Sequence, residues 1–177
     1  NMSIMNGIQH PDNFYTWGTG GYNWTTNYGY YNLWSADNTT TGYNDNSVVK
    51  TVYDPSPVGF KMPASNAFTG FTTTGQNSST QSEFNVDGTS DLQTYQNNFG
   101  HNFWTSSSKT ATINFPASAY RSNDNGSLNI VGIYGSYWSA VPYDTNYGCY
   151  LIFNWSAVTP LYRFHRTFGF AVRPVAE

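Results

Sequence analysis

Short runs of alternating polar and apolar residues in the second half of the chain predict β-strands. The clearest run is 110–115, which alternates until Pro116 ends it. Over residues 127–177 we expect an antiparallel meander, with a connection at 156–160 that is short enough for a hairpin-like turn. Its extended segments are expected at 127–133, 136–140, 149–154 and 168–174.

Residues 1–50 carry many aromatic side chains among Gly, Asn and Thr, without a period of 3.6 residues. The rings are Phe14, Tyr15, Trp17, Trp24, Tyr28, Tyr30, Tyr31 and Trp34. We expect long ordered loops with short strands there, pinned by buried rings. A disordered segment is the alternative, but so many rings argue against it.

Residues 51–75 mix rigid turns with short regular elements. A strand is expected at 51–53, and the Asp-Pro-Ser-Pro sequence at 54–57 predicts a rigid turn because each proline fixes its own φ and restricts its predecessor. A short helix should open after Pro63, with Ser65 or Asn66 as its N-cap. Phe68 and Phe71 would then lie one turn apart on its inner face.

Residues 76–110 form the most polar stretch of the chain. This polarity predicts a surface loop. Phe99, Phe103 and Trp104 are expected to anchor it to the body of the protein.

The composition favours a core of rings under a polar surface. Of the 177 residues, 38% are hydrophobic and 19% are aromatic, so rings make up half of the apolar content. Charged residues are only 10%, and Asn, Ser, Thr, Tyr and Gly replace them. This mixture favours strands and turns, and it resembles the composition of antibody paratopes. A binding domain and a mere scaffold both fit it.

Charge and hydropathy exclude several partners. The net charge is −3 with seven Lys and Arg in no basic stripe, which argues against nucleic-acid binding. No apolar run approaches ~18 residues, so we expect no membrane insertion. No signal peptide is visible, and the first residue is Asn, so a fragment or a processed chain is expected. The single cysteine, Cys149, excludes an internal disulfide framework.

No local pattern proposes catalysis, a metal or another cofactor. The three histidines are scattered at His10, His101 and His165, outside any metal-ligand spacing. No glycine-rich phosphate loop is present, and no local pair of carboxylates points to glycoside hydrolysis. The Asp-Asn-Gly sequence at 124–126 fits a turn better than a calcium loop, since it lacks the glutamate at the twelfth position. Cys149 fits an inert thiol better than a nucleophile. We therefore expect a protein that is not an enzyme.

Four segments in order resemble one family. They are Tyr53-Asp54-Pro55-Ser56-Pro57-Val58-Gly59-Phe60-Lys61-Met62-Pro63, Phe115-Pro116-Ala117-Ser118-Ala119-Tyr120-Arg121, Gly135-Ser136-Tyr137-Trp138-Ser139-Ala140 and Gly169-Phe170-Ala171-Val172-Arg173-Pro174-Val175. Together they resemble the Fibrobacter succinogenes major paralogous domain of Bacteroidetes surface proteins, over about residues 9–177. The resemblance implies a single domain with an α+β, C-type-lectin-like fold. Ser56 departs from the pattern, which has a cysteine at that position.

The end of the chain resembles a narrower group, the variable proteins of diversity-generating retroelements in gut phages and Bacteroidetes. Arg166-Thr167-Phe168-Gly169-Phe170-Ala171-Val172-Arg173 fits their Arg-x-x-Gly-Phe-x-x-Arg ending. In that group an error-prone reverse transcriptase rewrites adenines, which turns AAC or AAT codons into many residues but never into Lys, Glu, Gln, Met or Trp. Residues 140–168 contain no Lys, Glu, Gln or Met, and Trp155 would be a fixed position.

The run Leu161-Tyr162-Arg163-Phe164-His165 shows neither period 2 nor period 3.6. Its mixture of apolar, cationic and imidazole side chains is typical of an interface, although an aromatic strand packed on one face is the alternative. By the resemblance, the scaffold would bury Trp138, Phe153, Phe170 and Val172, while Arg166 or Arg173 would hold backbone turns. The displayed, ligand-binding set would be Tyr143, Asp144, Asn146, Tyr147, Tyr150, Ile152, Ala157, Thr159, Leu161, Tyr162, Arg163, Phe164, His165 and Phe168.

This resemblance implies a receptor-binding or adhesion domain that is extracellular, on a cell surface or on a virion. Its partner would be a protein or glycan ligand on a cell surface, and attachment to a larger fibre or surface protein is expected. The first alternative is a carbohydrate-binding module, although the calcium-lectin triplets Glu-Pro-Asn and Gln-Pro-Asp are missing. Further alternatives are a purely structural domain of an adhesin or tail fibre, and an enzyme like the formylglycine-generating relatives.

Overall fold

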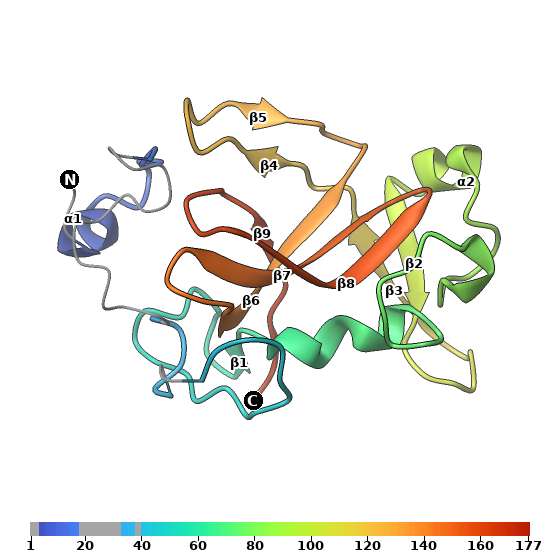
Figure 1. The fold of residues 1–177 in the computed structure, drawn as a ribbon, viewed down its shortest axis with the longest axis horizontal. Coiled ribbons are helices and arrows are strands. Elements are labelled where there is room, and N and C mark those ends of the chain that lie inside the picture. The colour runs from blue at the N-terminus through green and yellow to red at the C-terminus, as the bar shows by residue number, and fades with distance from the viewer. Residues whose placement is uncertain (1–3, 18–32, 38–39) are drawn as a thin grey trace.

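The computed structural model describes residues 4–17, 33–37 and 40–177, which Figure 1 draws in colour. Small antiparallel sheets and a few short helices dominate these residues, which agrees with an α+β or mainly β class. The helices are α1 (Ile4–Gln9), the 3₁₀ helices η1 (Ser65–Phe71) and η2 (Gln81–Glu83), and α2 (Leu92–Asn97). The strands are β1 (Phe60–Lys61), β2 (Gly100–Trp104), β3 (Thr112–Pro116), β4 (Tyr120–Arg121), β5 (Leu128–Asn129), β6 (Gly135–Pro142), β7 (Tyr147–Asn154), β8 (Ala157–His165), β9 (Ala171–Val172) and β10 (Val175–Ala176).

The largest sheet in the described residues has the strand order β8-β7-β6-β9. Strands β6, β7 and β8 are antiparallel neighbours, as expected for a meander, whereas β9 returns beside β6 in the parallel direction. Smaller two-stranded sheets pair β1 with β10, β2 with β3, and β4 with β5. The expected extended segments at 127–133 and 168–174 are therefore wrong in extent, because only the two residues of β5 and the two residues of β9 form strands there.

Strand β8 occupies residues where we expected a turn at 156–160 and an interface run after it. The turn is shorter than expected, since Ala157 already pairs with Asn154. A bulge then shifts the register, because Tyr150 pairs with Tyr162 whereas Ile152 pairs with Thr159. The extra residue on β8 breaks the period of two in the sequence. Pro160 is tolerated because β8 is an edge strand.

The outer edge of β8 is partly closed by the segment at residues 77–78. Ser78 and Val158 exchange two backbone hydrogen bonds of 2.9 Å. The side-chain amide of Asn77 donates to the Leu161 carbonyl at 2.8 Å and accepts from the Leu161 N–H at 3.0 Å. The backbone of Ser78 and the side chain of Asn77 together thus take the place of a neighbouring strand over part of this edge.

The four-stranded sheet is the central sheet of the described residues, and a cluster of buried side chains covers each of its faces. Successive side chains of a strand point to opposite faces and so enter different clusters. The first core cluster comprises Phe68, Phe84, Tyr95, Phe103, Phe115, Ala117, Tyr137, Leu151, Phe153 and Val158. The second core cluster comprises Val48, Met62, Trp138, Ala140 and Tyr150, with Trp34, Ala64, Ile152, Phe164, Phe168, Phe170 and Val172 packed against it. Neighbouring residues alternate between the two clusters, as Tyr137 and Trp138 do on β6. The prediction that Trp138 and Phe153 are buried is confirmed, and Phe170 and Val172 are partly buried against the second core cluster.

The predicted helix after Pro63 exists as the 3₁₀ helix η1, but its predicted N-cap is wrong. Ala64 takes the N-cap position and offers no side-chain hydrogen bond. The Ser65 hydroxyl instead accepts from the Asn44 N–H at 2.8 Å, which ties η1 to a distant loop. Phe68 is buried and Phe71 packs beside it at 5.9 Å between ring centroids, as predicted.

Two expected segments around η1 differ from the structure. Residues 51–53 form a turn rather than a strand, and the side chain of Val52 is 91% exposed. The stretch 76–110 contains η2, α2 and β2 rather than a loop alone. Of its three expected anchors, Phe103 is fully buried and Trp104 partly buried, whereas Phe99 is exposed at a left-handed φ of 52°.

The N-terminal expectation is only partly met in the described residues. Trp24, Tyr28, Tyr30 and Tyr31 lie outside these residues. Helix α1 replaces part of the expected loop, and the rings of Phe14 and Trp17 are exposed rather than buried.

Candidate functional site

The connection between β6 and β7 forms a turn built around one carboxylate. Asp144 Oδ1 accepts from the backbone N–H of Asn146 at 2.8 Å and of Tyr147 at 2.9 Å. The guanidinium of Arg166 donates to the Thr145 carbonyl at 3.4 Å, which confirms its predicted hold on a backbone turn. Arg173 instead lies over the ring of Phe115. The turn at 143–147 is therefore fixed by groups other than its outward rings.

Two tyrosine rings lie beside one cation next to this turn, and a third ring packs on one of them. The Cζ atom of Arg163 lies 4.2 Å from the centroid of the Tyr143 ring and 5.9 Å from that of Tyr147. The ring of Tyr43 packs on Tyr143 at 5.4 Å. We call Tyr43, Tyr143, Tyr147 and Arg163 the tyrosine–arginine cluster. The ring of His165 borders it at 4.8 Å from Tyr147.

A layer of packed rings supports the neighbouring part of the sheet. Tyr150 is only 3% exposed and packs at 5.5 Å on Trp138 and 4.6 Å on Phe170. Phe164 and Phe168 lie 4.7 Å apart and also pack on the second core cluster. The prediction that Tyr150 is displayed is therefore wrong, because its side of β7 faces this core.

The remaining predicted site residues differ in how exposed they are and in where they lie on the β7–β8 hairpin. Tyr162 and Arg163 are exposed. The half-buried ones are Tyr143, Asp144, Asn146, Tyr147, Ile152, Ala157, Thr159, Leu161, Phe164, His165 and Phe168. Residues 143–147 and 162–168 meet at one end of the β7–β8 hairpin, where Tyr147 pairs with His165. Ile152, Ala157 and Thr159 lie towards the other end, where Asn154 pairs with Ala157, so the structure does not bring them into the same group.

Sequence reasoning missed the contribution of the loop at residues 40–48. The N–H of Gly42 donates to the Pro142 carbonyl at 3.0 Å, which places Tyr43 beside the turn after β6. The sequence showed that residues 1–50 are rich in aromatic side chains, but no local pattern linked Tyr43 to Tyr143, which lies 100 residues further along the chain.

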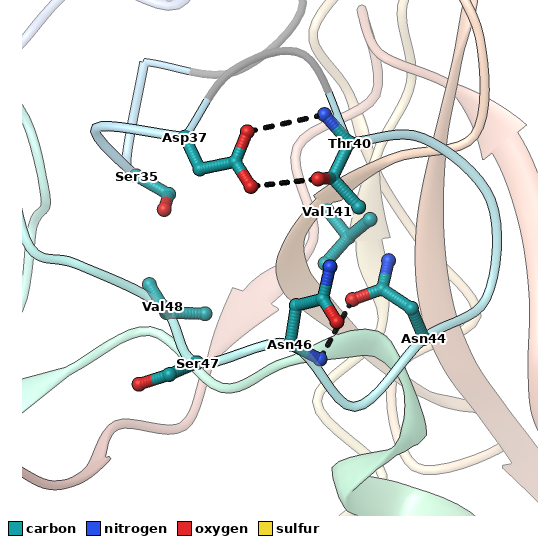
Figure 2. A pocket seen from close by; sticks show the side chains of 8 residues that line it. All are labelled: Ser35, Asp37, Thr40, Asn44, Asn46, Ser47, Val48 and Val141. Atoms are coloured by element: carbon teal, nitrogen blue, oxygen red, sulfur yellow. Dashed lines mark hydrogen bonds between the residues drawn. The ribbon is translucent and has the colours of Figure 1, made fainter.

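The same loop lines a small open pocket (Figure 2). Its empty space, open solvent included, is about 240 Å³. The carboxylate of Asp37 accepts from the N–H and the hydroxyl of Thr40, and Asn44 Oδ1 accepts from the Asn46 N–H at 2.9 Å. The lining residues are Ser35, Asp37, Thr40, Asn44, Asn46, Ser47, Val48 and Val141. These groups can form hydrogen bonds with hydroxyls.

Burial controls the protonation of several groups near the site. It raises the pKa of the Cys149 thiol to about 12 and that of Tyr43 to about 12, so both stay protonated at neutral pH. Burial lowers the pKa of His165, which favours its neutral form. A buried, protonated thiol is a poor nucleophile.

The described residues show neither a cluster of metal ligands nor a membrane-spanning helix. No group of three or more His, Cys, Asp or Glu side chains that could hold a metal ion occurs there. The sequence at 124–126 forms a turn, in which the Gly126 N–H donates to the Ser122 carbonyl at 2.9 Å. Within the part of the chain that the structure describes, no helix has the length and apolar character needed to cross a membrane.

The fold and the site together define a β-rich domain with rings and one exposed arginine gathered at one end of its central sheet. Residues 87–175 match the family described as "Domain of unknown function (DUF8237)". The match spans half of the chain, and the chain belongs to this family. No curated protein and no solved structure matches the chain.

Proposed function

We propose that this protein is a non-catalytic ligand-recognition domain with a C-type-lectin-like fold. Its C-terminal binding surface would be hypervariable and generated by a diversity-generating retroelement. It would act in receptor binding or adhesion, outside the cell, on a cell surface or on a virion. Its ligand would be a protein or glycan on a cell surface.

The observation that carries this proposal is the separation between outward side chains and the groups that hold their backbone. The turn at 143–147 is held by Asp144 and Arg166, and Tyr162 and Arg163 project from a strand whose backbone pairs with β7. Exchange of the outward side chains would therefore leave these bonds in place. Rings on a rigid β framework lose little conformational entropy on binding.

A pair of libraries tests this proposal. The first randomises Tyr143, Tyr147, Tyr162 and Arg163 with the codons reachable from AAC by adenine replacement. The second does the same at the buried residues Trp138, Tyr150, Leu151 and Phe153. Displayed on yeast and challenged with protease, most members of the first library should stay intact, and most of the second should be cleaved.

Equal cleavage of both libraries would contradict the proposal. The surrounding DNA tests the retroelement itself: a nearby reverse-transcriptase gene and a near-copy of the final segment that differs only at adenines are expected. If the genome contains neither the gene nor the near-copy, the retroelement part of the proposal is rejected, whereas the recognition function is not.

The pocket in Figure 2 favours a second candidate, a carbohydrate-binding module. Its hydroxyls, amides and carboxylate are the groups that bind sugar hydroxyls, and the ring of Tyr43 lies on the same loop. A glycan array with and without EDTA tests this candidate. Binding that Asp37→Asn abolishes while Arg163→Gln preserves would favour the carbohydrate module.

A further inference from the structure

Arg163 is an exposed cation that forms no ion pair with a carboxylate of the described residues. Its side chain is exposed, and its contacts are the two tyrosine rings beneath it. Within the described ranges, the ion pair present joins Lys50 to Glu177, far along the chain. The segments outside those ranges contain no Asp or Glu. A carboxylate of this chain therefore does not neutralise Arg163.

The carboxylate in the turn between β6 and β7 already accepts hydrogen bonds from its own turn. Asp144 accepts two backbone hydrogen bonds within its own turn, and its charge acts on Arg166. An aromatic contact uses the flat face of a guanidinium, whereas its five N–H groups lie in its plane. Stacking on Tyr143 thus orients the Arg163 side chain and leaves donors for an external acceptor.

The groups around Arg163 do not compete with it for an anion. Tyr43 keeps its phenol proton at neutral pH, so its hydroxyl can donate a hydrogen bond. The half-buried ring of His165 favours its neutral form. The exposed guanidinium of Arg163 thus lies beside phenol rings, which suits a carboxylate that a planar fork can bind with two parallel hydrogen bonds.

We propose that the tyrosine–arginine cluster binds a carboxylate of an acidic protein segment, with Arg163 donating both hydrogen bonds. This inference rests on the proposed recognition function and names its ligand class. A protein partner is favoured over an acidic glycan because Tyr and Arg are the residue types that carry most binding energy in protein interfaces. The rings beside Arg163 would cover the aliphatic part of a glutamate side chain.

The test measures binding of hexaglutamate and hexaglutamine peptides to the full chain by calorimetry. Hexaglutamate should bind, hexaglutamine should bind about tenfold more weakly or not at all, and added salt should weaken the first. Arg163→Gln should weaken hexaglutamate binding about tenfold. Arg163→Lys keeps the charge but loses the planar fork, so its affinity should fall between the two.

Lys109→Gln is the matched control, since it removes the same charge from an exposed residue in the β2–β3 connection. It should leave hexaglutamate binding unchanged. Equal losses in Arg163→Gln and Lys109→Gln would overturn the inference, because they would reveal a general charge effect. Tighter binding of oligogalacturonate than of hexaglutamate would also overturn it in favour of an acidic glycan.

Failure of this inference is separable from failure of the proposed function. The library experiment depends on folding and not on the ligand. If the surface library stays protease-resistant while hexaglutamate fails to bind, the recognition function stands and the acidic ligand is rejected. If the surface library is cleaved, the recognition function itself is rejected.

Discussion

Tyr150 and Tyr162 face each other on neighbouring strands and offer a matched comparison of supporting and displayed rings. Tyr150 is 3% exposed, whereas Tyr162 is 45% exposed. Replacing Tyr150 by Ala removes ring contacts with Trp138 and Phe170 and leaves a cavity, at a cost of about 4 kcal/mol. Replacing Tyr162 by Ala removes mainly its contact with Tyr150 at 5.7 Å, at a cost of about 1 kcal/mol.

Thermal unfolding followed by circular dichroism distinguishes the two variants. For a chain of this size, each kcal/mol shifts the melting temperature by roughly 2–4 °C, so Tyr150→Ala should lower it by about 10 °C and Tyr162→Ala by about 3 °C. Tyr162→Phe serves as a control that keeps the ring. If both Ala variants lost the same stability, Tyr162 would belong to the core and the division between support and display would be refuted.

Two further outcomes follow from buried contacts. Burial lowers the pKa of His101 to about 4 from an ordinary value of 6.5, so the unfolded chain takes up the proton first, and roughly 3 kcal/mol of stability should be lost as pH falls from about 6.5 to about 4. Urea unfolding across this range should show that His101→Phe lacks this loss, and an equal decline in both proteins would disprove it. A Cβ at Gly148 would lie 2.8 Å from the Trp138 ring, so Gly148→Val should cost about 2 kcal/mol and change the near-UV spectrum of the indole. Gly70→Ala, in open space, should do neither, and an unchanged Gly148→Val would contradict the packing described.

The sequence predicted strands best where polar and apolar residues alternate regularly and a proline follows them. Strand β3 lies within the region that the 110–115 pattern predicted, although it begins two residues later, at Thr112, and includes Pro116 as its last residue. Strand β8 was expected only as the alternative for residues 161–165, because a bulge changes which residues share a face and no sequence period survives that change. The parallel return of β9 depends on packing between distant segments, which local patterns do not encode.

The candidate site was partly predictable for a similar reason. The neighbourhood of residues 143–147 and 162–165 was expected from the sequence and is close in space. Tyr150 was misassigned because β6 and β7 are covered on both faces, so alternation alone does not tell which face meets solvent. Tyr43 enters through a hydrogen bond between Gly42 and Pro142, a contact between segments remote in sequence.

The hydrogen bonds that residues 77–78 make to the outer edge of β8 have a consequence for solubility. Unsatisfied backbone groups on an edge strand invite pairing with another molecule and then aggregation. The two hydrogen bonds of the Asn77 side chain go to the main-chain N–H and carbonyl of Leu161, so any residue except proline at position 161 can form the same two bonds. Together with the backbone bonds of Ser78, Asn77 thus protects this edge from pairing with another molecule in a way that does not depend on the side chain at position 161.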